Sequence, residues 1–114
     1  MNDVQILCSN KSGFDVLHRF EGWQIGEIKY RDGLEKATLE RLEKHNTTDE
    51  IFVLLSGNAS LYIGKELKET QLKRGCIYNV PKGVWHTITL SKDAKVIVFE
   101  NVYTEVNDKV KFKD

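Results

Sequence analysis

Short apolar runs separated by turn residues recur along the 114-residue chain, and this spacing constrains the fold more than any other feature. The runs interpreted as strands are 4–8, 23–30, 51–55, 59–63, 76–80, 86–90 and 96–99. Turn residues stand between them, among them Gly57-Asn58, expected to form a hairpin, and Pro81-Lys82-Gly83. Strands spaced by about eight to twelve residues with such turns are typical of a β-sandwich or barrel. The sequence therefore predicts an all-β fold.

The segment 34–45 is ambiguous between helix and strand. Its Leu, Glu, Lys, Ala and Arg residues favour a helix by propensity, but its apolar positions make only a loose helical stripe. With a period of two, Ala37, Leu39, Arg41, Glu43 and His45 share one face. Composition alone predicts helix; the family resemblance given below favours a strand in the second half. The charged tail 103–114 is expected to be an edge strand or a loose end.

Charge and length limit the classes of function. Seventeen basic residues balance seventeen acidic ones, so no overall positive field attracts nucleic acid or an anionic membrane. No apolar run approaches the length of a membrane span, and Met1-Asn2-Asp3 does not resemble a secretory leader. We expect one domain over residues 1–114 in a cytoplasmic protein that binds neither nucleic acid nor membrane.

Two cysteines are too few and too distant in sequence for a disulfide scaffold or a cysteine zinc site. Cys8 and Cys76 both adjoin apolar residues, so we expect buried, reduced thiols. His18 belongs to no motif and is expected at the surface or half-buried.

Four side chains with ligand chemistry flank the predicted strands. Glu43 and His45 are two residues apart, Glu50 begins a buried strand, and His86 begins another after Pro81-Lys82-Gly83. If these strands are neighbours, two imidazoles and a carboxylate can hold a divalent metal with coordination positions left open. The alternative is that the histidines are ordinary hydrogen-bonded barrel residues and that Glu50 only orients one of them.

These residues also carry a resemblance to a known family. The pattern G-x5-P-x-G-x2-H is matched at every spacing by Gly75, Pro81, Gly83 and His86. In the pattern G-x5-H-x-H-x(3,4)-E-x6-G, His45, Glu50 and Gly57 match, whereas Glu43 replaces the first histidine and Ala37 the opening glycine. The chain resembles a small single-domain cupin.

The resemblance implies a double-stranded β-helix (jelly-roll) barrel with His45, Glu50 and His86 as ligands of Zn, Fe, Mn or Ni near its mouth. It places Glu43 beside the metal, as a fourth ligand or a general base. Tyr78, in the strand of the second motif, has two interpretations: a residue of the core or an interface, which is the commoner role of such aromatics, or a residue that lines the pocket and contacts the bound molecule. Small cupins commonly pair, so we expect a homodimer.

Two functions remain open. One is a metal-dependent enzyme acting on a small polar molecule, with Glu43 moving protons. The other is a module that binds or senses a sugar or small acid without turnover. The sequence does not distinguish oxygenase, isomerase and lyase chemistry.

Overall fold

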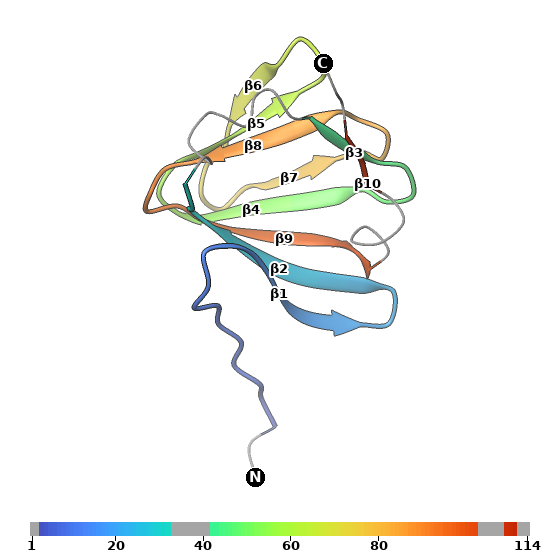
Figure 1. Ribbon diagram of the computed structural model, residues 1–114. Coiled ribbons are helices and arrows are strands. Elements are labelled where there is room, and N and C mark those ends of the chain that lie inside the picture. The colour runs from blue at the N-terminus through green and yellow to red at the C-terminus, as the bar shows by residue number, and fades with distance from the viewer. Residues whose placement is uncertain (1–2, 33–41, 103–108, 112–114) are drawn as a thin grey trace.

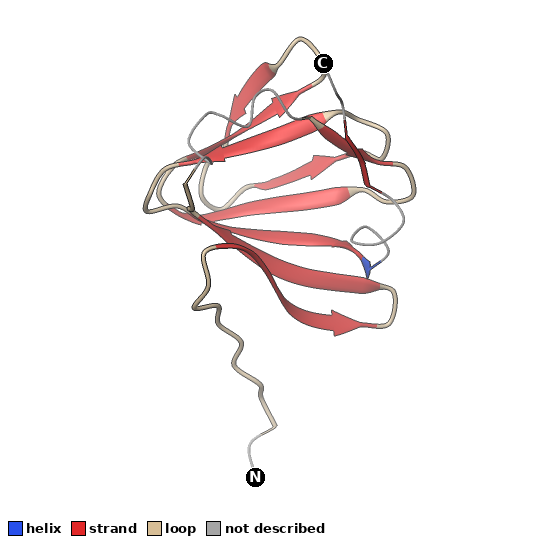
Figure 2. Ribbon diagram, in the orientation of Figure 1, coloured by secondary structure: helices blue, strands red, loops and turns tan. Residues whose placement is uncertain are grey.

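The computed structural model describes residues 3–32, 42–102 and 109–111, and the regular structure of these residues is almost entirely β-strand (Figure 1, Figure 2). The strands are β1 (Gly13–Phe20), β2 (Trp23–Lys29), β3 (Glu43–His45), β4 (Glu50–Ser56), β5 (Ala59–Ile63), β6 (Lys68–Gln71), β7 (Ile77–Val80), β8 (His86–Leu90), β9 (Lys95–Asn101) and β10 (Lys109–Lys111). The described residues contain no helix long and apolar enough to cross a membrane.

The strands form two antiparallel sheets that face each other (Figure 1). The first sheet has the order β1-β2-β9-β4-β7, and the second has the order β10-β3-β8-β5-β6. From β7 to β9 each successive strand lies in the opposite sheet, so the chain crosses between the layers instead of forming hairpins. This arrangement confirms the predicted all-β jelly roll.

Alternation along the strands explains why the two sheets pack together. On β9, Val96 and Val98 are fully buried, while Ile97 and Phe99 face outward. On β4, Phe52 and Leu54 are buried in the same way. The buried apolar cluster consists of Phe52, Leu54, Ala59, Leu61, Leu72, Val80, Leu90, Ala94, Val96 and Val98. Burial of this surface is the main force that holds the sheets together.

Gly57 connects the sheets, which corrects one expectation. The Gly57-Asn58 turn joins β4 to β5, and these strands lie in different sheets, so it is a corner and not a hairpin. Gly57 has φ +72°, and a Cβ atom there would lie 2.6 Å from the Cα atom of Ala94. The backbone of the β8–β9 turn is therefore packed directly against the corner, which leaves room only for glycine.

Two further expectations are wrong. Residues 4–8 are extended but pair with no strand among the described residues, and they form an arm that projects from the barrel (Figure 1). Cys8 on this arm and Cys76 before β7 are both exposed. Cys8 lies on the arm outside both sheets, and Cys76 lies between the turn at Arg74-Gly75 and β7, so an apolar neighbour in sequence buries neither thiol.

The ambiguous segment is a strand where the structure describes it. β3 pairs with β8 through Glu43 and His86, which supports the strand interpretation for 43–45. Residues 33–41 and the tail residues 103–108 and 112–114 lie outside the described residues, whereas 109–111 form β10 beside β3.

Candidate metal centre

Three strands from two sheets bring the predicted ligands together. His45 ends β3 and His86 begins β8, which are neighbours in the second sheet. Glu50 begins β4 in the opposite sheet. The two imidazoles therefore meet the carboxylate across the interior, as the sequence predicts.

The three side chains converge on a single oxygen atom. The Nε2 atom of His45 lies 3.0 Å from Oε1 of Glu50, and the Nε2 atom of His86 lies 2.9 Å from the same oxygen. One potential ligand atom from each residue lies within 4.8 Å of the others. His45, Glu50 and His86 are 4%, 8% and 5% exposed, so water contributes little to their solvation.

The two histidines differ at the ring nitrogen that faces away from Glu50. Nδ1 of His86 lies 3.0 Å from the carbonyl oxygen of Val84, which can only accept, so this nitrogen carries a hydrogen. In a neutral imidazole the lone pair of Nε2 then faces Glu50. Nδ1 of His45 is buried and has no hydrogen-bond partner among the described residues.

Opposing effects set the protonation of the cluster. Burial by itself lowers the pKa of His45, but hydrogen bonding to Glu50 and the negative charges of Glu50, Glu100 and Glu43 outweigh it, so the pKa is raised above 6.5. Burial by itself raises the pKa of Glu50, but hydrogen bonds from His45 and His86, and the charge of His86, lower it to about 2. The carboxylate is thus held ionised beside groups that favour positive charge.

This donor set fits a divalent cation. Two imidazole nitrogens and one carboxylate oxygen meet at a buried point where a positive charge must stand between them, either protons on the imidazoles or a metal ion. Two ligands at about 2.1 Å from a metal on perpendicular bonds lie about 3 Å apart, close to the observed separations. The ligand types suit zinc, iron, manganese or nickel.

Glu43 lies beside the cluster but outside its three converging atoms. It is half-buried, shares the inner face of β3 with His45, and stands opposite His86 in the β3–β8 register. Tyr78 is half-buried against the apolar core, and its hydroxyl accepts a hydrogen bond from the backbone N–H of Lys73 at 2.9 Å. Its register partner is Phe52, one inward position from Glu50, so a pocket role for Tyr78 remains a prediction.

A row of polar residues that the sequence did not predict lies behind Glu50. Glu100 is the register partner of Glu50 on β9, and Gln24 is the register partner of Glu100 on β2. Nε2 of Gln24 donates to Oε2 of Glu100 at 2.8 Å, and Nε of Arg19 donates to Oε1 of Gln24 at 2.9 Å. Gln24 is 0% exposed. The side-chain interaction between Glu100 and Glu50 also lowers the pKa of Glu50.

Strand parity gives the signal that would have found this row. Glu100 is an even number of residues from Val96 and Val98 on β9, so it faces the same side of the strand as they do. Gln24 faces the same side of β2 as Gly26 and Ile28 for the same reason. A polar residue in an otherwise inward-facing series marks a polar site in the interior.

Hydrogen bonds from the backbone and from the Asp49 side chain hold the segment around His45 against the turn before His86. The N–H of Gly83 donates to the carbonyl of His45 at 2.6 Å. Asp49 accepts from the N–H of Lys82 at 2.9 Å and from the side-chain amide of Asn79 at 3.1 Å. The hydrogen bonds from Lys82 and Asn79 lower the pKa of the Asp49 carboxyl. The loop before β4 is therefore fixed to the turn before β8, which places His45 and His86 relative to Glu50.

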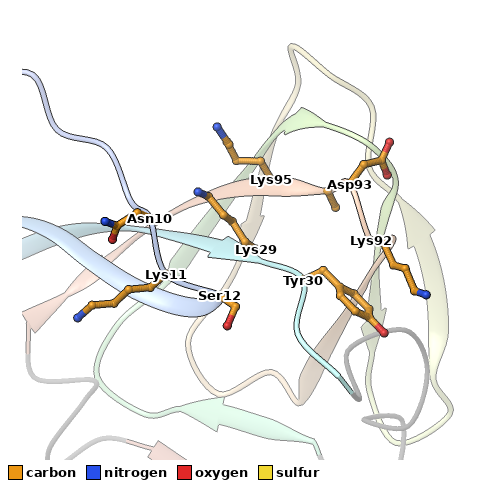
Figure 3. Close-up of a pocket in the computed structure, with 9 residues that line it drawn as sticks. Asn10, Lys11, Ser12, Lys29, Tyr30, Lys92, Asp93 and Lys95 are labelled. Atoms are coloured by element: carbon orange, nitrogen blue, oxygen red, sulfur yellow. The ribbon is translucent and has the colours of Figure 1, made fainter.

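A hollow of about 380 Å³ lies at the opposite end of the strands, where Lys29 and Lys95 are paired in register (Figure 3). It is lined by Asn10, Lys11, Ser12, Lys29, Tyr30, Lys92, Asp93, Ala94 and Lys95. Lys29 donates to the carbonyl of Ser9, Lys95 lies 3.6 Å from Glu27, and Lys11 lies 3.9 Å from Asp15. Because protein groups already engage most of these cations, we do not assign a ligand site here.

Comparisons of sequence place this geometry among known proteins. The sequence profile described as "Cupin domain" matches residues 33–100. An uncharacterized protein of Streptomyces coelicolor is 37% identical over 57 residues, which are 49% of this chain and 52% of that protein. The match thus spans about half of that relative's length.

Solved structures show the same fold. A cupin-2 domain protein from Shewanella frigidimarina superposes with a TM-score of 0.63 at 21% identity, covering 82% of this chain and 84% of that chain. Pac13 from Streptomyces, a nucleoside dehydratase, superposes with a TM-score of 0.64 at 12% identity, covering 92% and 82%. An Fe(II) form of HppE superposes with a TM-score of 0.58 at 17% identity, covering 89% of this chain and 58% of that chain.

Proposed function

The chain belongs to the cupin domain family, and from this premise we propose that His45, Glu50 and His86 hold a single divalent metal ion on which the function depends. The observation that carries the proposal is the approach of both Nε2 atoms to one Glu50 oxygen, with the other nitrogen of His86 committed to Val84. A bound ion would polarise an oxygen atom of a small polar substrate.

The protein's own groups have separable roles in this proposal. His45 and His86 present neutral nitrogens, Glu50 supplies a negative charge, and the hydrogen bond to Val84 fixes the tautomer of His86. Glu43 stands on the same inner face and would accept or donate the proton that a reaction requires. The apolar core below the cluster keeps water away from it.

One enzyme among the similar structures supports a catalytic role, although none of these structures assigns a substrate. Pac13 is a dehydratase and has been solved with uridine, and HppE has been solved with Fe(II). We propose a metal-dependent enzyme acting on a small polar molecule, with zinc, iron, manganese or nickel as its metal. We also propose that it works as a homodimer in the cytoplasm.

One observation favours a second candidate function. Glu43 stands where the family pattern has its first histidine, so one imidazole of the usual set is replaced by a carboxylate. The second candidate is therefore a module that binds a sugar or small acid without converting it. A ligand screen by thermal shift discriminates, because a ligand that binds the folded protein raises its melting temperature as the ligand concentration increases. Turnover of any candidate substrate excludes the purely binding role.

Metal analysis of untagged protein tests the main proposal. We expect about one equivalent of a divalent metal in the wild type, and its loss in His45→Ala and in His86→Ala. His18→Ala is the matched control, because His18 lies on the outside of β1 against Trp23. If His45→Ala and His86→Ala retain the same metal content as the wild type and as His18→Ala, then His45 and His86 are not ligands.

A further inference from the structure

The two imidazoles of the candidate metal centre present the same nitrogen to Glu50 but differ on their far sides. Nε2 lies 3.0 Å from Oε1 of Glu50 in His45 and 2.9 Å from it in His86. On the far side, Nδ1 of His86 meets a carbonyl oxygen, whereas Nδ1 of His45 is buried without a hydrogen-bond partner in the part of the chain that the structure describes. This difference affects how firmly each ring can hold a metal.

The ring of His86 is fixed by the turn that precedes it. Its Nδ1 donates to the carbonyl oxygen of Val84 at 3.0 Å, and the backbone N–H of Val84 donates to the carbonyl of Pro81 at 3.3 Å. The ring of Phe52 also packs edge-on against His86, with 6.1 Å between the ring centroids. The hydrogen of the neutral imidazole is therefore held on Nδ1, and the lone pair of Nε2 is left for a metal.

The structure supports the backbone of His45 but not its ring tautomer. The carbonyl of His45 accepts a hydrogen bond from the N–H of Gly83 at 2.6 Å. A neutral imidazole that binds a metal through Nε2 must carry its hydrogen on Nδ1, and in His45 no described acceptor receives it. The loss of such a partner typically lowers metal affinity by about 10- to 100-fold, so His45 should be the weaker imidazole ligand.

His45 is also the ligand that costs least to release. Glu50 supplies the negative charge of the centre, and a carboxylate attracts a divalent cation more strongly than a neutral imidazole does. His86 has its hydrogen held away from the metal by Val84. His45 has neither advantage, because its ring is neutral when it binds a metal and its Nδ1 has no described partner.

The contact seen in this structure provides a place for the released ring. With its hydrogen on Nε2, His45 donates to the Glu50 carboxylate at 3.0 Å. A carboxylate has two oxygens and several acceptor positions, so Glu50 can accept this hydrogen bond and still bind a cation. His45 therefore has two stable arrangements within one cluster, which differ in whether its hydrogen lies on Nδ1 or on Nε2.

We propose, on the basis of the metal centre proposed above, that His45 is the exchangeable ligand and yields its position to an oxygen atom of the substrate. In this exchange the bond from Nε2 of His45 to the metal breaks and a bond from the substrate oxygen forms. A hydrogen leaves Nδ1 as another reaches Nε2, so the ring stays neutral. Glu50 and His86 remain bound. The substrate class that suits this exchange has two neighbouring oxygen donors, because the second oxygen compensates for the lost imidazole.

NMR of the imidazole nitrogens in the zinc-loaded full-length protein tests the exchange, with acetohydroxamate as a probe that offers two oxygens. The chain has three histidines, so His45 and His86 are assigned by single substitutions, and His18 serves as the reference. With zinc alone, we expect both rings to be bound through Nε2 and to carry hydrogen on Nδ1. Saturating acetohydroxamate should return His45 to a neutral ring with hydrogen on Nε2 and leave His86 unchanged.

Competition with a chelator of known affinity gives an independent measurement. The zinc affinity of His86→Ala should be lower than that of His45→Ala by about tenfold or more, because only His86 has a partner that fixes its tautomer. Far-UV circular dichroism of both variants reports whether the fold is retained.

The outcomes separate the exchange from the metal centre itself. Wild-type protein that binds no zinc rejects the metal centre, and the exchange with it. If zinc binds but acetohydroxamate does not bind, leaves His45 on the metal or displaces His86, only the exchange role of His45 is overturned. Equal zinc affinities of folded His45→Ala and His86→Ala also overturn it, because the two imidazoles would then be equivalent ligands.

Discussion

The two ends of the barrel interior are built on the same strands but from opposite kinds of residue. From the candidate metal centre toward the far end, the inward residues are Glu50, Phe52 and Leu54 on β4, His86, Ile88 and Leu90 on β8, and Glu100, Val98 and Val96 on β9. On each strand, the inward residue next to the ionisable one is apolar. The apolar end stabilises the fold, and it thereby holds in place polar groups whose burial is costly on their own.

Truncation at the apolar end should have the largest effect on stability. Leu54→Ala removes a side chain that is 4% exposed, and the cavity that remains should lower the free energy of unfolding by about 2 to 5 kcal/mol. Denaturant titration measures the change. The metal content of the folded protein should stay at the wild-type value, because Leu54 is two inward positions from Glu50.

Leu55→Ala is the matched control for this substitution. Leu55 follows Leu54 on β4 but is 46% exposed, so its truncation should cost much less. Equal losses for the two variants would contradict the assignment of Leu54 to the core. Loss of metal from folded Leu54→Ala would show that the two ends are not separable.

The polar end should make stability depend on pH in two directions. The pKa of Glu50 is lowered from 4.5 to about 2, so its contribution is present above pH 4.5 and is lost as the pH falls toward 2. The expected loss is on the order of 3 kcal/mol. The pKa of His45 is raised above 6.5, so its contribution is present below pH 6.5 and is lost as the pH rises through the higher folded value. Stability should therefore fall on an acidic limb, which reports Glu50, and on an alkaline limb, which reports His45. Thermal melting of the metal-free protein across this pH range measures both limbs.

Glu50→Gln should flatten both limbs, because it removes the charge that the histidines face. Glu66→Gln, at an exposed turn, is the control and should leave them unchanged. Added metal should reverse the alkaline limb, since the ligands bind metal only when the imidazoles have lost their protons. A metal-induced stabilisation that does not grow with pH would argue against histidine ligation.

The polar row behind Glu50 should influence the metal less than a ligand does. Gln24→Leu removes the amide that donates to Glu100 and accepts from Arg19, so the carboxylates behind the metal lose their fixed orientation. We expect metal affinity to fall by about 10- to 100-fold, as for other groups that orient a ligand. Competition with a chelator of known affinity measures it, with the melting temperature of the metal-free variant recorded in parallel.

Gln71→Leu on exposed β6 is the control for Gln24→Leu and should bind metal as the wild type does. If Gln24→Leu loses stability without losing affinity, the row supports only the fold. Wild-type protein that binds no metal would instead reject the proposed metal centre itself.

The sequence predicts the fold and the three converging residues because both depend on local patterns. Strand alternation, turn residues and the spacing before His86 are properties of short segments. The continuous apolar run 51–55 was interpreted as a buried strand, and the structure gives it two roles: Phe52 and Leu54 face the core, and Ile51 and Val53 face outward. A run without alternation therefore also indicates apolar residues on the outer side of the first sheet.

The missed features depend on pairing between distant segments. Gln24 and Glu100 are 76 residues apart and meet only because β2 lies beside β9. The exposure of Cys8 depends on the arm remaining outside the first sheet, which its apolar neighbours do not reveal. Position within a segment is predictable from residue type, whereas the neighbour across a sheet depends on the order of strands.

The smallest effect on the metal is expected from Glu43, the residue for which the sequence left most open. Glu43 is half-buried and lies outside the three atoms that converge, so Glu43→Gln should lower metal affinity by less than about tenfold. Chelator competition against Glu50→Gln measures this difference on one scale. A loss as large as that of Glu50→Gln would make Glu43 a fourth ligand and shift the expected metal toward harder ions such as manganese. A small loss combined with abolished turnover would leave Glu43 as the group that moves protons, in the place where the family pattern has an imidazole.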